Sequence, residues 1–108
     1  MAKLDLLQGT LDLLILKTLA TGSNHGWGIC NRIRQMSRDS LQVSHGSLYP
    51  ALHRLELSGD VRSEMMPSEN NRRARVYTIT ASGRRRLETE KSGWEQFALS
   101  IRRVLQAE

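Results

Sequence analysis

The spacing of the apolar residues changes twice along this chain of 108 residues, and the order of those changes limits the folds open to it. Three successive segments place apolar residues three and four positions apart, which is the spacing of one helical face. Two short runs of strand-forming residues follow, at about 61–66 and 75–80, and helical spacing then returns over about 81–105. The sequence therefore predicts a mainly α (α+β) fold: three helices, a two-stranded β-hairpin and a long C-terminal helix.

The first two predicted helices cover about residues 10–20 and 25–37. Thr10 and Asn24 stand at their N-terminal ends, and both residue types are common N-caps because their side-chain oxygens accept backbone N–H groups. Each helix has one apolar stripe, and we expect both stripes to face a common core. The stripes are Leu11, Leu14, Ile15 and Leu19 in the first helix, and Ile29, Ile33 and Met36 in the second.

The third predicted helix covers about residues 44–57 and contains Pro50. Two N-caps are open for it. If Ser47 is the cap, Pro50 falls in the first turn, where a proline is tolerated; if Ser44 is the cap, Pro50 lies deeper and kinks the helix. The buried stripe of this helix is Leu48, Leu52 and Leu55.

The last helix carries more apolar residues than the core of so small a chain can cover. Leu87, Trp94 and Ile101 recur every seven residues, in the manner of a coiled-coil seam. A helix of this length extends about 35 Å at 1.5 Å per residue, beyond such a core. We therefore expect a second copy of the chain to cover the seam in a homodimer. The predicted dimer interface is Leu4, Leu7, Leu11, Leu87, Trp94, Phe97, Ile101 and Leu105.

The excess positive charge lies in one segment. The formal net charge is +5, and seven arginines against two glutamates lie between Arg62 and Arg86, so the remaining nine basic and nine acidic residues cancel. A focused basic patch is typical of a surface that meets a polyanion, although a solvated strip is the alternative. Arg84, Arg85 and Arg86 open a helix, where cations oppose the helix dipole, and a nearby polyanion would offset that effect.

Three helices followed by a hairpin form the winged helix-turn-helix, whose third helix enters the major groove of DNA. We predict that this helix presents Ser47, Ala51 and Arg54 away from the core, with Arg54 paired to a guanine edge. Tyr49 and His53 lie on a flank, near phosphates, although Tyr49 could instead pack half-buried on the hairpin. The hairpin is the wing, whose arginines follow the phosphates or enter the minor groove. The predicted DNA-binding residues are Ser47, Tyr49, Arg54, Asn71, Arg72, Arg73 and Arg75.

Four stretches of the chain resemble the PadR family of transcriptional regulators. They are residues 7–11 (LQGTL), 25–29 (HGWGI), 46–56 (GSLYPALHRLE) and 75–80 (RVYTIT), and the third is the most specific. Trp27 departs from the family, which usually has tyrosine after His-Gly. The resemblance covers nearly the whole chain, and the single C-terminal helix is similar to that of the short subfamily.

The resemblance implies a winged-helix homodimer that represses transcription from palindromic operators in double-stranded DNA. It implies dimerisation through the C-terminal helix with help from the first helix, which agrees with the uncovered seam. In some drug-responsive relatives a tryptophan on the last helix lies at the dimer interface and stacks on planar ligands, and Trp94 matches it in kind and approximate place. A small planar aromatic effector at Trp94 is therefore one hypothesis, and a plain interface residue is the other.

Other classes of protein find little support in the sequence. The lone Cys30 rules out an internal disulfide framework and favours a reducing cytoplasm, and no apolar run is long enough to cross a membrane. His25, His45 and His53 are too scattered for a metal site. We expect no cofactor and no enzymatic activity, because no phosphate-binding glycine loop and no spaced catalytic triad is present.

The sequence leaves two alternatives to a PadR-type regulator. One is a winged helix that binds protein without specific DNA binding, and the other is a winged-helix regulator of the MarR group, whose chains are usually longer. We expect residues 1–80 to form the DNA-binding part and residues 81–108 the dimerisation helix, within one compact unit.

Overall fold

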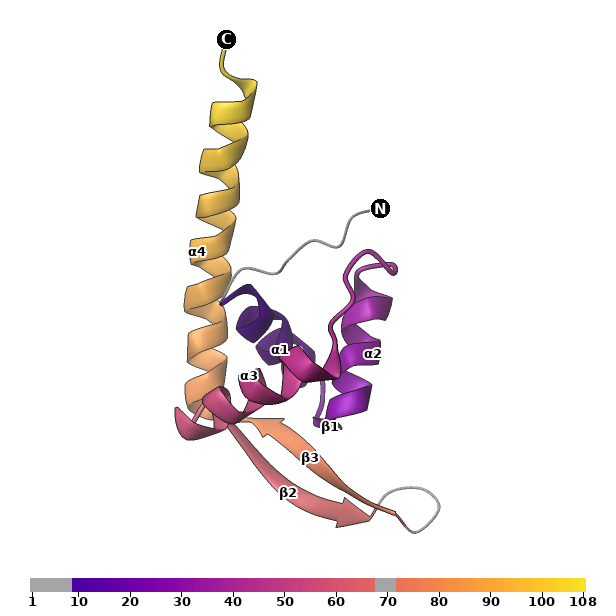
Figure 1. The fold of residues 1–108 in the computed structure, drawn as a ribbon. Helices are drawn as coiled ribbons and strands as arrows, with labels where there is room; N and C mark the ends of the chain where they lie inside the picture. Colours follow the sequence, from indigo (N-terminus) through magenta and orange to yellow (C-terminus); the bar gives the residue numbers. More distant parts are fainter. Residues whose placement is uncertain (1–8, 68–71) are drawn as a thin grey trace.

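The predicted order of helices and strands is present in the computed structural model, which describes residues 9–67 and 72–108 (Figure 1). Leu4, Leu7 and Asn71 lie outside the described residues. The chain forms a winged helix-turn-helix followed by a long helix. The elements are α1 (Thr10–Ala20), β1 (Asn24–His25), α2 (Gly26–Met36), α3 (His45–Leu57), β2 (Val61–Pro67), β3 (Arg73–Ile79) and α4 (Ala81–Gln106).

The sheet has three antiparallel strands in the order β1-β3-β2, one more than the sequence predicted. β2 and β3 pair from Val61 opposite Ile79 to Pro67 opposite Arg73. The extra strand β1 is only two residues long, and its His25 pairs with Val76. β1 was missed because two residues carry no alternation pattern, and it joins the start of α2 to the hairpin.

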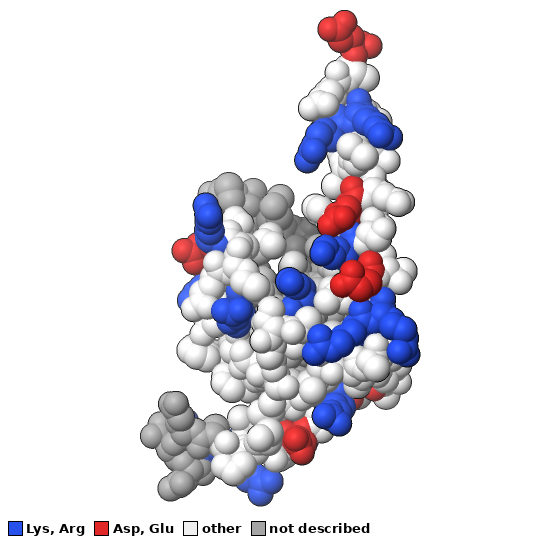
Figure 2. All heavy atoms as spheres, turned by 180° about the vertical axis from the view of Figure 1, so that it is seen from behind, with Lys and Arg blue, Asp and Glu red and all other residues white. Residues whose placement is uncertain are grey.

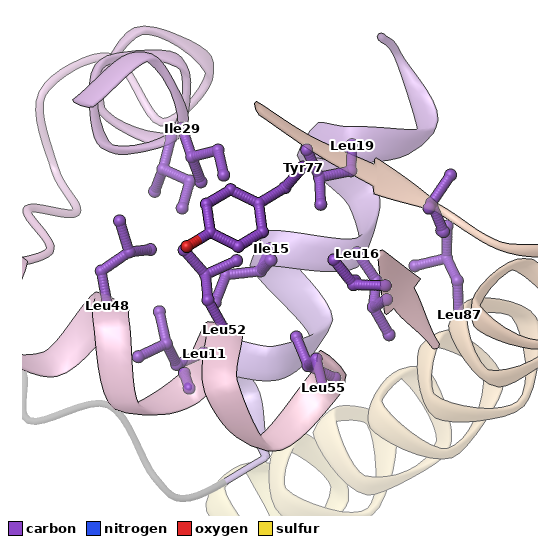
Figure 3. Close-up of a cluster of buried hydrophobic side chains, with 14 residues drawn as sticks. Leu11, Ile15, Leu16, Leu19, Ile29, Leu48, Leu52, Leu55, Tyr77 and Leu87 are labelled. Carbon is purple, nitrogen blue, oxygen red and sulfur yellow. The ribbon is translucent and has the colours of Figure 1, made fainter. Parts of the chain in front are cut away.

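The core lies between α1, α2, α3 and the base of the hairpin. Figure 3 shows leucines and isoleucines of α1 facing the leucines of α3, with the Tyr77 ring among them and Ile29 and Leu87 toward the two sides of the cluster. The predicted stripes are confirmed except at Leu14, which is only partly buried, and at Met36, which is exposed. Cys30 packs against this core, and burial raises the pKa of its thiol, so it stays protonated at neutral pH.

At the starts of three helices the structure either has another N-cap than the predicted one or decides between two predicted N-caps. Gly9, and not Thr10, precedes α1, with no side-chain cap. His25 caps α2 in place of Asn24, because its Nδ1 accepts from the N–H of Gly28 at 3.0 Å. Ser44 caps α3, accepting from the N–H of Ser47 at 3.2 Å.

The Ser44 cap leaves Pro50 inside α3. A proline has no N–H, so the carbonyl of Gly46 lacks its usual partner four residues on. The start of α4 is better satisfied: Thr80 accepts from the N–H of Gly83 at 3.1 Å. A Cβ at position 83 would collide with the carbonyl oxygen of Asp60, so only glycine lets α4 approach the turn before β2 this closely.

α4 projects from the body of the protein, and the hairpin projects near the opposite end of the same helix (Figure 1). The described residues measure 60 × 33 × 21 Å along their principal axes. Only the part of α4 before Leu99 packs on the body, because all of its residues from Leu99 onward are exposed. No helix in residues 9–67 and 72–108 has the length and apolar character to cross a membrane.

Candidate nucleic-acid interface

An open groove lies between α3, the start of α2 and the outer part of the hairpin. Its volume is about 340 Å³. Two exposed aromatic side chains, Trp27 at 61% and Tyr49 at 46% exposure, lie beside the arginines of β3. Stacking rings and guanidinium groups together suit a phosphate-bearing, base-bearing ligand. The lining residues are His25, Gly26, Trp27, Tyr49, Arg72, Arg73, Ala74 and Arg75.

Tyr49 faces this groove because α2 approaches α3 at a glycine. A Cβ built on Gly26 would lie 2.7 Å from the Tyr49 hydroxyl oxygen, closer than such atoms approach. The ring also meets His45 edge to face, with the ring centroids 5.9 Å apart. Tyr49 is thus held on one side while its exposed edge borders the groove.

The arginines of β3 point to the same side as α3. Side chains two apart on a strand share a face, so Arg73 and Arg75 lie on the face of buried Tyr77. Arg75 Nη1 donates to Ser63 Oγ at 3.0 Å, and Ser63 Oγ donates to Glu56 Oε2 of α3 at 2.7 Å. The wing is therefore tied to α3 with Arg73 and Arg75 beside Tyr49.

His25 and Trp27 were not among the predicted DNA-binding residues. They reach the groove because β1 pairs with β3 and thereby brings the start of α2 to the wing. Their rings stack with centroids 6.4 Å apart. The sequence signal for both residues is the HGWGI stretch, which places two ring-bearing side chains at the start of α2.

The outward face of α3 differs from the predicted one. Ala51 is completely buried, because it lies three residues after Leu48 and four before Leu55, on their face. The face opposite the core consists instead of Gly46, Pro50, His53 and Leu57, all of them exposed.

Two polar residues predicted for that outward face lie on the flank toward α1. Ser47 Oγ accepts a hydrogen bond from Ser44 Oγ at 3.1 Å. Arg54 Nη2 lies 3.3 Å from Asp12 Oδ1 of α1, so its guanidinium is held on the side of α3 away from Tyr49. Its half-exposed side chain is not among the groove residues.

Arg86 is the centre of an ion-pair cluster that the sequence did not indicate. Its three kinds of nitrogen each meet a different carboxylate: Nη2 lies 3.1 Å from Asp12, Nη1 3.0 Å from Asp60 and Nε 2.7 Å from Glu90. Asp12 and Asp60 are both 6% exposed. Cations at the start of α4 oppose the helix dipole, and we expected a nearby polyanion to offset this effect. At Arg86 the protein's own carboxylates offset it, whereas Arg84 and Arg85 are exposed.

Burial alone would raise the pKa of Asp60, but hydrogen bonds from Ser82, Ser58 and Arg86 outweigh it and hold the pKa below its usual value. A carboxylate with a lowered folded-state pKa stabilises the fold above its unfolded pKa of about 3.9, and that stabilisation disappears as the pH falls through the folded pKa. We expect Asp60→Asn to melt well below the parent protein at neutral pH and the gap to narrow in acid below about pH 4. Melting curves followed by circular dichroism test this, and a gap of constant size down to about pH 2.5 would contradict it.

The described residues that were predicted for the dimer interface divide into two groups, one buried and one exposed. Leu87, predicted for the dimer interface, is 6% exposed and belongs to the protomer's own core, as does Leu11 at 9%. The other four remain open to solvent: Trp94, Phe97, Ile101 and Leu105 are 44–78% exposed. Basic and acidic side chains are interleaved along much of α4 in the view of Figure 2.

A second open hollow, also of about 340 Å³, lies where α1 meets the middle of α4. Leu13 of α1 and Trp94 and Phe97 of α4 form its apolar part. It is therefore continuous with the exposed seam. The remaining lining residues are Gly9, Thr10, Glu90 and Gly93.

Comparison with known proteins finds one family. The sequence model of the transcriptional regulator PadR-like family matches residues 15–89. The chain is 36% identical to the transcriptional regulator Rv3488 of Mycobacterium tuberculosis over 94 residues, which are 87% of this chain and 84% of that protein.

Solved structures agree with the family match. A transcriptional regulator from Clostridium thermocellum is similar with a TM-score of 0.81 and 28% identity, covering 89% of this chain and 93% of its own. A PadR family transcription regulator from Clostridium difficile R20291 has a TM-score of 0.76 and 25% identity, covering 88% of this chain and 97% of its own.

Proposed function

This chain belongs to the transcriptional regulator PadR-like family, and we propose that it acts in the cytoplasm as a homodimeric repressor that binds palindromic operators in double-stranded DNA. Family members and structural neighbours are transcription regulators, so the chain is a regulator and not an enzyme. The observation that carries the proposal is the orientation of the groove: Tyr49 of α3 and the arginines of β3 border the same hollow, so one duplex can engage both.

In this proposal α3 enters the major groove with its outward face. Gly46 and Pro50 have no long side chain there, which permits close approach, and the Pro50 ring suits contact with a thymine methyl group. His53 supplies the polar contact to a base edge. Ser47 and Arg54 lie on the flank, where they can contact the backbone of one strand. The phosphates on the opposite flank of α3 meet Tyr49 and Trp27. They also meet the predicted wing residues Asn71, Arg72, Arg73 and Arg75.

Arg73→Ala is expected to weaken binding to specific and random duplexes alike. Arg73 is exposed and is placed to contact phosphate, and each phosphate that the protein no longer neutralises lowers the slope of log affinity against log salt by about 0.9. With one Arg73 in each protomer, the slope of a dimer should fall by about two. Fluorescence anisotropy over a range of salt concentrations measures it.

The control for this prediction is Arg103→Ala, which removes the same charge from the far part of α4. Its slope should equal that of the parent protein, because exposed charges many ångströms from the duplex are screened. If neither the parent nor the variants bind duplex DNA in a salt-dependent manner, the regulator would bind through protein contacts, which is the alternative function.

The dimer is supported by the seam of α4. Trp94, Phe97, Ile101 and Leu105 are exposed on a helix that leaves the body of the protein, and a second α4 packed against them would bury them. The hollow beside Trp94 and Phe97 would then be closed on one side by the partner. This arrangement supports a small planar aromatic effector that stacks on Trp94 and relieves repression.

An effector at Trp94 predicts saturable fluorescence quenching by a planar aromatic molecule such as 9-aminoacridine. The chain has two tryptophans, so Trp27→Phe leaves Trp94 as the sole emitter and Trp94→Phe leaves Trp27. We expect saturable quenching in the parent and in Trp27→Phe, and only linear, collisional quenching in Trp94→Phe. Equal quenching of both variants would show that the quencher has no specific site at Trp94, which would then be a plain interface residue.

A further inference from the structure

One carboxylate connects the DNA-reading helix to the helix that carries the seam. Asp12 Oδ1 lies 3.3 Å from Arg54 of α3, and Asp12 Oδ2 lies 3.1 Å from Arg86 of α4. Arg86 also bonds Asp60, at the turn that leads from α3 into β2. The cluster therefore joins α1, α3, the base of the wing and α4 at one point.

The arrangement of this cluster is too specific for a general surface ion pair. Every nitrogen of the Arg86 guanidinium is used, and Asp60 also accepts from Ser82 at 2.6 Å and from Ser58 at 2.7 Å. Beside it, Gly83 lets the first turn of α4 lie against the Asp60 carbonyl. Arginine holds carboxylates in fixed directions because its planar fork has several rigid donors, so such a cluster fixes an angle as well as a distance.

The angle of α4 matters because the helix acts as a lever. The 15 steps along the helix from Arg86 to Ile101 span about 22 Å at 1.5 Å per residue. A rotation of about 10° at Arg86 would displace the seam by about 4 Å, close to the 3.4 Å rise of one base pair. The partner protomer and its reading helix would move with the seam.

We propose that Arg86, through the Asp12 carboxylate that it shares with Arg54, is a positioning residue that sets the angle between α3 and α4 and thereby the half-site spacing that the dimer recognises. This inference rests on the proposed function, since it requires a dimer that binds two half-sites. It adds a determinant of spacing that touches neither the duplex nor the partner.

The test begins with an operator selected by the parent protein from random duplex DNA. Affinity is then measured on versions of it with one or two base pairs added or removed between the half-sites. Arg86→Gln should flatten the preference of the parent, from about tenfold or more between adjacent spacings to less than about threefold, or move its optimum. The matched control Arg85→Gln removes the same charge one residue away, on an exposed side chain, and should keep the preference of the parent.

Two more variants allow the test to be made if Arg86→Gln does not fold. Arg86→Lys retains the charge but not the fork, and Asp12→Asn is nearly isosteric; both should flatten the preference as Arg86→Gln does. The proposal is overturned if any variant of the cluster that folds keeps the spacing preference of the parent, and also if none of them folds, because the cluster would then serve folding alone. Failure of the parent to bind any selected duplex would instead refute the proposed function.

A second measurement needs no DNA. Spin labels on His53→Cys, in a Cys30→Ala background, report the distance between the two reading helices of a dimer by pulsed electron resonance. The parent and Arg85→Gln should give one narrow distance distribution, and Arg86→Gln a broadened or shifted one. Identical distributions in all three would overturn the proposal even if the spacing preference changed.

Discussion

Ile101→Asp is expected to turn the dimer into monomers. Ile101 is 44% exposed in the protomer and lies midway along the exposed seam, so both copies of it would be desolvated in a dimer. Fully burying an isoleucine side chain contributes about 1.5–3 kcal/mol, of which the 44% still exposed accounts for roughly half, and an aspartate there must be desolvated without a partner. Two such changes per dimer should raise the dissociation constant at least about 100-fold. Sedimentation equilibrium measures it.

Gln96→Asp is the control for Ile101→Asp. It places the same new charge on the same helix, but at an exposed position on the side away from Trp94 and Ile101. This control should remain dimeric and should bind a palindromic duplex like the parent. If Ile101→Asp also remained dimeric at micromolar concentration, the seam of α4 would not be the interface.

Arg86→Met is expected to destabilise each protomer by about 2–3 kcal/mol. Removing one partner of a buried ion pair typically costs about 3–5 kcal/mol, and we lower that figure because the Arg86 side chain is 31% exposed. The destabilisation follows because Asp12, Asp60 and Glu90 would remain together, and among the described residues Arg54 would be the one cation still paired with them. Glu90 Oε2 already lacks a hydrogen-bond partner among the described residues. Urea unfolding curves give the change.

Arg85→Met is the control for side-chain shape and net charge, and its unfolding midpoint should stay close to that of the parent. Asp60→Asn combined with Arg86→Met should recover part of the stability, because it removes one of the crowded carboxylates. Equal midpoints for Arg86→Met and Arg85→Met would show that the cluster contributes nothing to stability.

The helices, the hairpin and the long C-terminal helix were predictable because each repeats a local pattern over many residues. Leu48, Leu52 and Leu55 mark the inner face of α3 by spacing alone. The same spacing, applied to Ala51, would have placed that residue in the core, so the error there was one of interpretation. The strand β1 left no such pattern because it has only two residues.

The candidate site was predictable only in part. The arginines of β3 and Tyr49 were found from charge and from the expected position of the third helix. Trp27 was missed because it reaches the groove through the pairing of β1 with β3, a contact between residues about fifty positions apart.

The Arg86 cluster was even less predictable, because it also depends on contacts between residues far apart in the sequence. Its carboxylates come from positions 12, 60 and 90, and no local spacing relates the first two to Arg86. A run of three arginines looked uniform in the sequence, yet the fold leaves Arg84 and Arg85 in solvent and surrounds Arg86 with acids. Which arginine serves the fold and which meets a ligand depends on tertiary contacts.

The two tryptophans offer the most direct test of where the duplex binds. Trp27 lines the groove between α3 and the wing, whereas Trp94 lies on the seam of α4. Each gives one indole N–H signal in a nitrogen–proton correlation spectrum, assigned with Trp27→Phe. On adding the selected operator duplex, the Trp27 signal should shift and the Trp94 signal should stay in place. A shift confined to Trp94, or none at either indole in a sample that binds the duplex, would contradict the account.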